Sequence, residues 1–223
     1  MKLIVITKKF PYFNTEAFLE SEIEFYKNSF DRVTFLPIIK GPVRESHSNL
    51  SINDSYNHLY RKKKLQCLSV LFSKHFYSEL FHSGKKMLDR NYLTKLVNQD
   101  IHYRILKNVI KNERELFDSE CLVYCYWFSS SVYALLKLRQ EFGLKYKVVC
   151  RAHRYDVYDE TGEMPNRAFC IENIDQIFPI SEDAIETFTK KYGHREKYTL
   201  ARLGVKNHCF ENIPSKFHFF HVF

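Results

Sequence analysis

The sequence predicts a doubly wound α/β domain with a mostly parallel sheet and a helical insertion. Short apolar runs rich in β-branched residues alternate with segments whose apolar residues recur at helical spacing. This order is typical of parallel strands joined by crossover helices. A hydrophobic content of 45% over 223 residues is sufficient for one large domain with its own core.

The N-terminal elements open this pattern. The run Leu3–Ile6 predicts the first strand, and it is too short for a signal peptide or a membrane-spanning helix. We expect Asn14 or Thr15 to cap a helix that carries Glu16 in its first turn, and residues 32–38 to form the second strand. Because the connection between the two strands is one helix, we expect the strands to be parallel.

A long segment then interrupts the alternation. Residues from about 40 to 56 are rich in Ser and Asn and predict a loop. Residues from about 57 to 117 carry apolar positions at helical spacing, which predicts an insertion of two to four helices.

The alternation resumes toward the C-terminus. Strands are predicted at 121–126, in the run that begins at Lys147, at 174–180 and at 197–203. One predicted helix begins at 129–131 and ends at Gly143, a short one lies near 167–172, and another is capped by Ser181 and ends at Gly193.

Composition restricts the kinds of site that the chain can carry. There are only 6 glycines, and neither G-x-x-x-x-G-K-[ST] nor G-x-G-x-x-G occurs. The 6 cysteines form no C-x-x-C pair and are expected to be reduced, so we predict no zinc site, no other metal site and no cofactor. The net charge of +8 suits a membrane surface, a nucleic acid or a phosphorylated small molecule, but no nucleic-acid recognition motif supports the second of these.

The richest cluster of chemistry follows the strand that begins at Lys147. Residues past the carboxyl end of such a strand lie at the ligand-binding edge of an open α/β sheet. His153 can hydrogen-bond a ligand hydroxyl and changes charge near neutral pH, although it can equally serve to order the turn. The other candidates are Arg151 and Arg154, whose guanidinium groups can pair with a phosphate group, and Asp156 and Tyr158, which offer an acceptor and a hydroxyl, with a surface ion pair or a turn cap as the structural alternatives.

Two further candidates lie at the ends of other predicted strands. Trp127, the only tryptophan, offers an aromatic face on which a ligand can pack, or is a core residue with a hydrogen-bonded N–H. Glu16 offers a carboxylate beside the first loop, or simply stabilises a helix N-terminus.

Five segments, spread over residues 1 to 206, resemble the GT-B glycosyltransferases of the group-4 type that build bacterial surface polysaccharides. They are FPYFNTEAF at 10–18, YCYWF at 124–128, RAHRYDVY at 151–158, IDQIFPIS at 174–181 and ARLGV at 201–205. The resemblance implies two Rossmann-like domains around a cleft, the N-terminal one receiving the acceptor and the C-terminal one holding a nucleotide sugar. It also implies that His153 projects into the cleft as the catalytic residue, with Glu16, Trp127, Arg151, Arg154, Asp156 and Tyr158 as substrate-binding residues.

The resemblance covers only the acceptor side of such an enzyme. We therefore expect an acceptor-side domain at 1–206 and a linker or truncated tail at 207–223, with no C-terminal donor-binding domain and no counterpart of the paired-glutamate E-x7-E motif. The function implied is the acceptor-binding half of a glycosyltransferase, inactive alone, whose acceptor is a polysaccharide or a lipid-linked sugar. The alternative is a non-catalytic subunit that recruits a separate donor-domain protein to an anionic membrane.

The predicted surroundings follow from the same features. We expect a cytoplasmic protein, with a peripheral position at the inner face of the membrane as the alternative to a fully soluble one. The basic helices of the insertion would provide the contact with anionic lipid, whereas the simpler interpretation is an ordinary helical layer covering the sheet.

Overall fold

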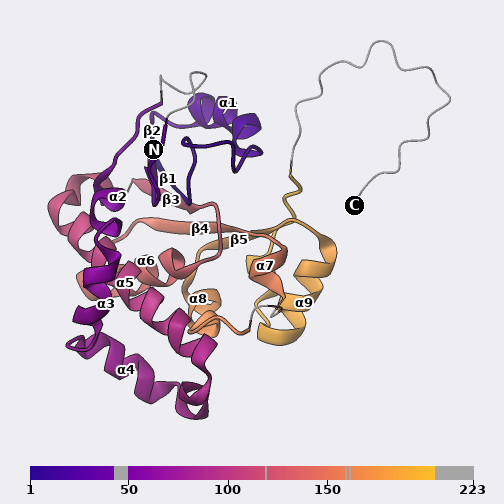
Figure 1. Cartoon of the computed structure of the whole chain (residues 1–223). Coiled ribbons are helices and arrows are strands. Elements are labelled where there is room, and N and C mark those ends of the chain that lie inside the picture. The colour runs from indigo at the N-terminus through magenta and orange to yellow at the C-terminus, as the bar shows by residue number, and fades with distance from the viewer. Residues whose placement is uncertain (43–49, 119, 159, 161, 204–223) are drawn as a thin grey trace.

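A sheet of five parallel strands forms the centre of the molecule in the computed structural model, which describes residues 1–42, 50–118, 120–158, 160 and 162–203 (Figure 1). The strands are β1 (Lys2–Thr7), β2 (Arg32–Pro37), β3 (Cys121–Cys125), β4 (Lys147–Ala152) and β5 (Gln176–Pro179). Their spatial order is β2-β1-β3-β4-β5, and every neighbouring pair is parallel. The predicted fold class, a doubly wound α/β domain, is confirmed.

The order of the strands creates a topological switch between β1 and β3. The chain leaves β1 through α1 (Leu19–Ser29) and returns as β2 on one side, whereas β3 lies on the other side of β1. The segments that leave β1 and β3 therefore diverge at the carboxyl edge of the sheet. Open α/β sheets bind their ligands at this kind of crevice.

Helices cover the two faces of the sheet unequally, with α1 above it and α5, α6 and α8 below it in Figure 1. The larger apolar core joins alternate strand residues such as Ile4, Val123 and Cys150 to the helices below. The smaller core joins the other strand face, including Val5 and Tyr124, to α1. This division follows from the strand geometry, in which successive side chains point to opposite faces.

The predicted insertion is a continuous set of helices. It contains α2 (Ser55–Tyr60), α3 (Lys63–Val70), α4 (Lys74–His82), the 3-10 turn η2 (Gly84–Leu88), α5 (Arg90–Asn112) and the 3-10 turn η3 (Arg114–Phe117). The helix α5 packs extensively on α6 (Ser130–Phe142) through buried residues such as Leu106 and Leu135. No helix in the described part of the chain is both long enough and apolar enough to cross a membrane.

The C-terminal third contains α7 (Arg154–Val157), α8 (Arg167–Asn173), α9 (Glu182–Tyr192) and the 3-10 turn η5 (Arg195–Lys197). Ser181 caps α9 as predicted, because its hydroxyl accepts a hydrogen bond from the Ala184 N–H at 3.2 Å. The short helix α7 was not predicted, since a single turn has no apolar periodicity. The expected domain end at 206 and the tail at 207–223 lie outside the described residues.

Two predicted elements are wrong. Asn14 and Thr15 do not cap a helix, because α1 begins at Leu19 and Glu16, with a φ of +58°, folds back into a turn instead. Residues 197–203 form no ladder strand, although Tyr198 makes an isolated bridge with Ile177. The segment still lies along β5, because the Thr199 and Ala201 N–H groups donate to the carbonyls of Ile177 and Pro179 at 3.1 and 2.9 Å, but it does not form a regular strand.

Candidate functional site

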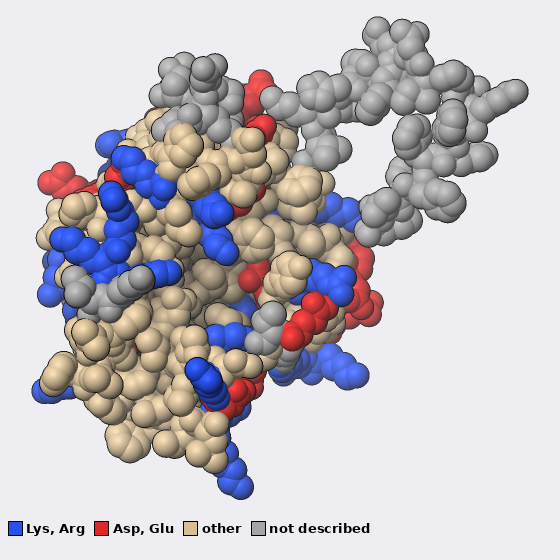
Figure 2. Space-filling view, in the orientation of Figure 1, with Lys and Arg blue, Asp and Glu red and all other residues tan. Residues whose placement is uncertain are grey.

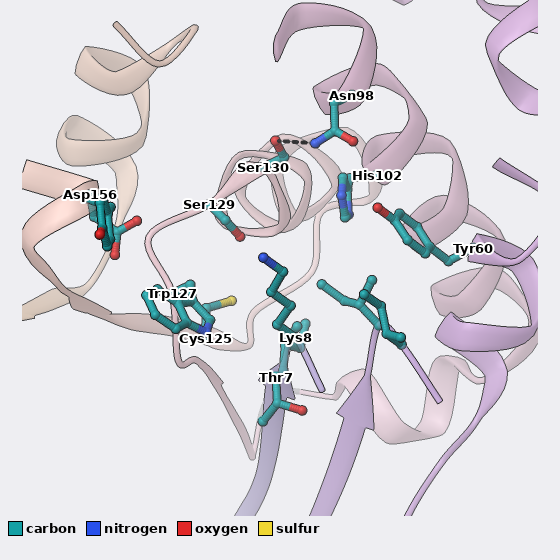
Figure 3. A pocket seen from close by; sticks show the side chains of 14 residues that line it. Thr7, Lys8, Tyr60, Asn98, His102, Cys125, Trp127, Ser129, Ser130 and Asp156 are labelled. Carbon is teal, nitrogen blue, oxygen red and sulfur yellow. Dashed lines mark hydrogen bonds between the residues drawn. The ribbon is translucent and has the colours of Figure 1, made fainter. Parts of the chain in front are cut away.

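A cavity of about 550 Å³ opens at the switch point, where the chain leaves β1 and β3 (Figure 3). Thr7 and Lys8 reach it from the end of β1, and Cys125 and Trp127 from the end of β3. The remaining polar lining comes from Tyr60, Asn98, His102, Ser129, Ser130, Tyr155 and Asp156. A cavity of this size can hold one or two sugar rings.

Lys8 supplies the positive charge of the cavity. Its side chain is exposed and points into the open space in Figure 3, and no described carboxylate lies within ion-pair distance of it. It follows the last residue of β1 directly, so the strand fixes the position of its backbone. An unpaired ammonium beside the N-terminal end of the 13-residue helix α6 favours a ligand that carries negative charge.

Trp127 forms an aromatic wall whose position is fixed by Glu16. The indole N–H donates to Glu16 Oε1 at 2.7 Å, and the same carboxylate accepts the backbone N–H groups of Lys8, Lys9 and Phe10 at 3.0, 2.7 and 2.7 Å. Glu16 thus ties the loop after β1 to the end of β3 across the switch point. These donors occupy its carboxylate in this structure, and the predicted role of Glu16 in substrate binding stays a prediction.

His153 lies behind this wall. It follows the last residue of β4, as predicted, and its ring packs on that of Trp127 with centroids 4.3 Å apart. The residue is 7% exposed, and its Nδ1 lies 3.6 Å from Asp156 Oδ2, beyond hydrogen-bond distance, so neither ring nitrogen makes a hydrogen bond among the described residues. Asp156 accepts a hydrogen bond from the His153 backbone N–H at 3.0 Å and also lines the cavity. The turn after β4 is therefore coupled to the cavity through Trp127 and Asp156.

The helix α5 contributes two side chains that sequence reasoning missed. Asn98 and His102 are one helical turn apart and face the same cavity, and the Asn98 amide donates to Ser130 Oγ at 3.4 Å. Burial lowers the pKa of His102 from 6.5 to about 4, and the nearby charge of Lys63 acts in the same direction. His102 is therefore neutral at pH 7, with its Nδ1 hydrogen-bonded to the Tyr56 hydroxyl.

Arg151 lies on the other face of the sheet, toward α1. Its guanidinium donates to the Tyr124 hydroxyl at 3.1 Å and to the Ala201 carbonyl at 3.3 Å, and it pairs with Glu22 at 2.8 Å. Since these groups surround a buried side chain, the structure separates Arg151 from the cavity. The alternation of side chains along β4 places it there, because Cys150 and Ala152 face the larger core.

Arg154 and Tyr158 border a second hollow, beside α9. Arg154 makes an exposed ion pair with Glu160 at 2.8 Å, which is the structural alternative considered for it from the sequence. The Tyr158 hydroxyl donates to Asp183, and this hydrogen bond raises the pKa of the tyrosine. The hollow has a volume of about 460 Å³ and is distinct from the switch-point cavity.

The candidate residues thus form three sets. Trp127 and Asp156 line the cavity, His153 and Glu16 contact the indole from behind or from its edge, and Arg151, Arg154 and Tyr158 lie elsewhere. Lys8 could have been found from its place directly after the first strand, and the α5 pair from its i, i+4 spacing. Within the described residues no three His, Cys, Asp or Glu side chains are grouped as metal ligands.

Comparison with known proteins supports the fold. No protein-family model matches this chain, and no curated protein matches it in sequence. Among solved structures, the chain is similar to a lipopolysaccharide outer core galactosyltransferase, WaaB, in its apo form, with a TM-score of 0.54 and 14% sequence identity. The similarity covers 90% of this chain and 45% of the galactosyltransferase, so the chain spans less than half the length of that protein. Its fold therefore matches a Rossmann-like half of a GT-B glycosyltransferase.

Proposed function

We propose that this chain is the acceptor-binding half of a glycosyltransferase. In the complete enzyme, a sugar would pass from a nucleotide sugar held by a donor-side domain to a hydroxyl of a polysaccharide or lipid-linked acceptor held by this chain. The observation that supports the proposal best is the cavity at the switch point, whose lining combines an indole face, an exposed lysine and several hydrogen-bonding side chains.

Each part of the lining suits part of an acceptor. The half-buried indole of Trp127 offers a flat face to the C–H groups of a sugar ring. Asn98, Ser129 and Asp156 supply donors and acceptors for sugar hydroxyls. Lys8 suits the phosphate of a lipid-linked sugar, because its ammonium lacks a carboxylate partner among the described residues.

The contribution of this chain to the reaction is placement. Holding the acceptor hydroxyl in line with the donor sugar converts an encounter of two molecules into a reaction within one complex. Glu16 would keep Trp127 in position through its hydrogen bond to the indole, and His153 would do so through ring packing. We retain His153 as a candidate contact with the reacting sugar, since neither ring nitrogen makes a hydrogen bond among the described residues, and Nδ1 lies 3.6 Å from the Asp156 carboxylate.

The proposal can be tested with Trp127 as the reporter, because it is the only tryptophan in the chain. We expect glucose 1-phosphate to change the Trp127 fluorescence saturably and to bind more tightly than glucose. Lys8→Gln should weaken the sugar phosphate by about tenfold, the loss of one charge-assisted hydrogen bond, and leave glucose unaffected. The matched control is Lys27→Gln on α1, which lies outside the cavity lining.

The outcome that contradicts the proposal is equally specific. If neither ligand changes the fluorescence, or if Lys8→Gln and Lys27→Gln behave alike, the cavity does not recognise a sugar phosphate. A Trp127→Phe variant followed by NMR chemical shifts would then show whether any ligand binds elsewhere on the chain.

A further inference from the structure

Large apolar side chains are exposed at the outer end of the helical insertion. Phe72, Phe81 and Leu88 are 88, 80 and 84% exposed, so these side chains are not part of the apolar core. Other exposed apolar side chains lie in the same segment of the chain, and we call the set the apolar tip: Leu68, Leu71, Phe72, Tyr77, Phe81 and Leu88. In the region of α3 and α4, Figure 2 shows a broad uncharged surface with Lys and Arg at its edges.

The helical spacing brings these side chains to one side of their helices. Leu68 lies in the last turn of α3, Leu71 and Phe72 follow directly after that helix, and Tyr77 and Phe81 are four residues apart on α4. The Tyr77 hydroxyl donates to the Leu71 carbonyl at 3.0 Å, so the two groups adjoin. The opposite sides of the same helices carry buried residues, among them Val70 and Phe76.

Buried polar contacts hold the tip on α5. Asp100 of α5, only 2% exposed, accepts a hydrogen bond from the Ser73 hydroxyl at 2.7 Å and contacts His75 Nδ1 at 3.0 Å. Arg104 pairs with the same carboxylate at 2.9 Å. The corner between α3 and α4 is therefore fixed from the inside, and the exposed rings are presented by an anchored element.

The charge around the tip is strongly one-sided. Residues 61 to 90 contain eight Lys or Arg and two carboxylates. One of these, Glu79, turns inward and accepts a hydrogen bond from the Asn166 amide at 2.9 Å, while Asp89 caps α5. Lys74 and Lys85 are exposed and have no acidic partner within the part of the chain that the structure describes.

We propose that the apolar tip inserts into an anionic lipid bilayer, with the surrounding lysines on the headgroups. Aromatic and aliphatic side chains bordered by lysine are the features by which amphipathic helices bind the membrane interface. A second copy of this chain is a poorer occupant, because a twofold contact through the tip would bring the same lysines face to face. The proposal does not depend on sugar transfer.

Vesicle flotation tests the proposal with the full chain. We expect binding to phosphatidylcholine vesicles that contain phosphatidylglycerol, weak binding to phosphatidylcholine alone, and release by salt. Phe72→Ser with Phe81→Ser should lower the partition coefficient by about tenfold for each ring removed. Phe25→Ser is the matched control, because Phe25 on α1 is 70% exposed but remote in sequence from the tip.

Separate variants measure the contribution of the lysine charges and the depth to which the rings enter the bilayer. Lys74→Glu with Lys85→Glu should abolish the preference for phosphatidylglycerol, whereas Lys27→Glu on α1 should not. Phe72→Trp should show a blue-shifted emission on binding and be quenched by brominated lipid, and Phe25→Trp should show neither. Because every altered side chain is exposed, unchanged thermal unfolding will confirm that the variants are folded.

Three results would overturn the proposal. The first is absence of binding to anionic vesicles, and the second is equal loss of binding in the tip variants and in Phe25→Ser. The third is that light scattering shows a dimer of the wild-type chain, that this chain does not bind vesicles, and that the tip variants are monomers. This last result would assign the tip to a second copy of the chain.

Discussion

At the scale of single residues, Glu16 links the two strand ends of the switch point. Its carboxylate accepts four N–H groups, three from the backbone at 8–10 and one from Trp127. We expect Glu16→Gln to lower the free energy of unfolding by ~1–3 kcal/mol, because an amide loses the charge and can accept fewer of these bonds. Urea unfolding followed by Trp127 fluorescence measures this effect.

Glu24→Gln is the matched control for Glu16, since Glu24 lies exposed on α1. It should leave the free energy of unfolding within about 0.5 kcal/mol of the wild type. A Glu16→Gln variant as stable as this control would show that the four donors do not depend on the carboxylate.

His102 predicts a pH dependence with a definite sign. Burial lowers its pKa in the folded chain from 6.5 to about 4, so the unfolded chain binds more protons between these values. Above pH 6.5 this histidine does not reduce the free energy of unfolding. As the pH falls from 6.5 toward 4, the free energy of unfolding decreases by ~3 kcal/mol because the unfolded chain takes up the proton first. In His102→Gln this part of the slope should vanish, and the exposed His194→Gln should retain it. Urea titrations from pH 4.5 to pH 7 would contradict the assignment if all three slopes agreed.

At the scale of elements, the residues of α5 contribute to three different parts of the molecule. Ile101, Ile105 and Leu106 belong to the larger core, Asn98 and His102 line the cavity, and the Asp100 side chain fixes the tip. Because the helix has 3.6 residues per turn, neighbouring positions serve different surroundings. The cavity and the tip are thus held by one rigid helix.

Gly143 ends α6 in the left-handed conformation, with a φ of +61°. The space around it is open, so a side chain there costs conformational energy without a clash. We expect Gly143→Ala to lower the free energy of unfolding by ~1 kcal/mol, and Gly143→Asn to cost less because asparagine tolerates this conformation. Urea unfolding of both variants measures these two effects. An equal decrease in the free energy of unfolding would exclude backbone conformation as the cause.

At the scale of the whole molecule, the chain offers one sheet, one switch-point cavity and one outward-facing apolar tip among its described residues. The proposed donor side has no counterpart in these elements. We therefore expect the purified 223-residue chain to release no nucleoside diphosphate from any nucleotide sugar. A two-domain glycosyltransferase in the same coupled assay is the control, and a clear rate from this chain alone would contradict the proposal.

The proposed function requires a protein that carries a donor-side domain. Mixing such a protein with the chain should restore turnover, and Lys8→Gln should reduce the restored rate more than Lys27→Gln does. Restored turnover insensitive to Lys8 would favour the alternative of a recruiting subunit.

Local sequence pattern was sufficient for most of the fold. The first two strands, the insertion, the helix that ends at Gly143 and the Ser181 cap could be predicted because each depends on residues close together in the chain. The prediction of a sixth strand was wrong, because residues 197–203 hydrogen-bond to β5 through Thr199 and Ala201 without forming a regular strand, and such pairing depends on the neighbouring strand and not on local pattern. The cap at Asn14 or Thr15 failed because Glu16 is held by a partner 111 residues away.

The candidate site divides in the same way. The sequence by itself determined the α/β order, the strand ends that carry Lys8, Trp127 and His153, and the excess of positive charge in the insertion. Only the tertiary structure decided which of these side chains meet, since Arg151 turns to the opposite face of the sheet and α5 brings Asn98 and His102 to the cavity. It also decided that the rings of Phe72 and Phe81 stay outside the core. The physical reason is that periodicity records which residues are apolar, whereas burial depends on the elements that pack against them.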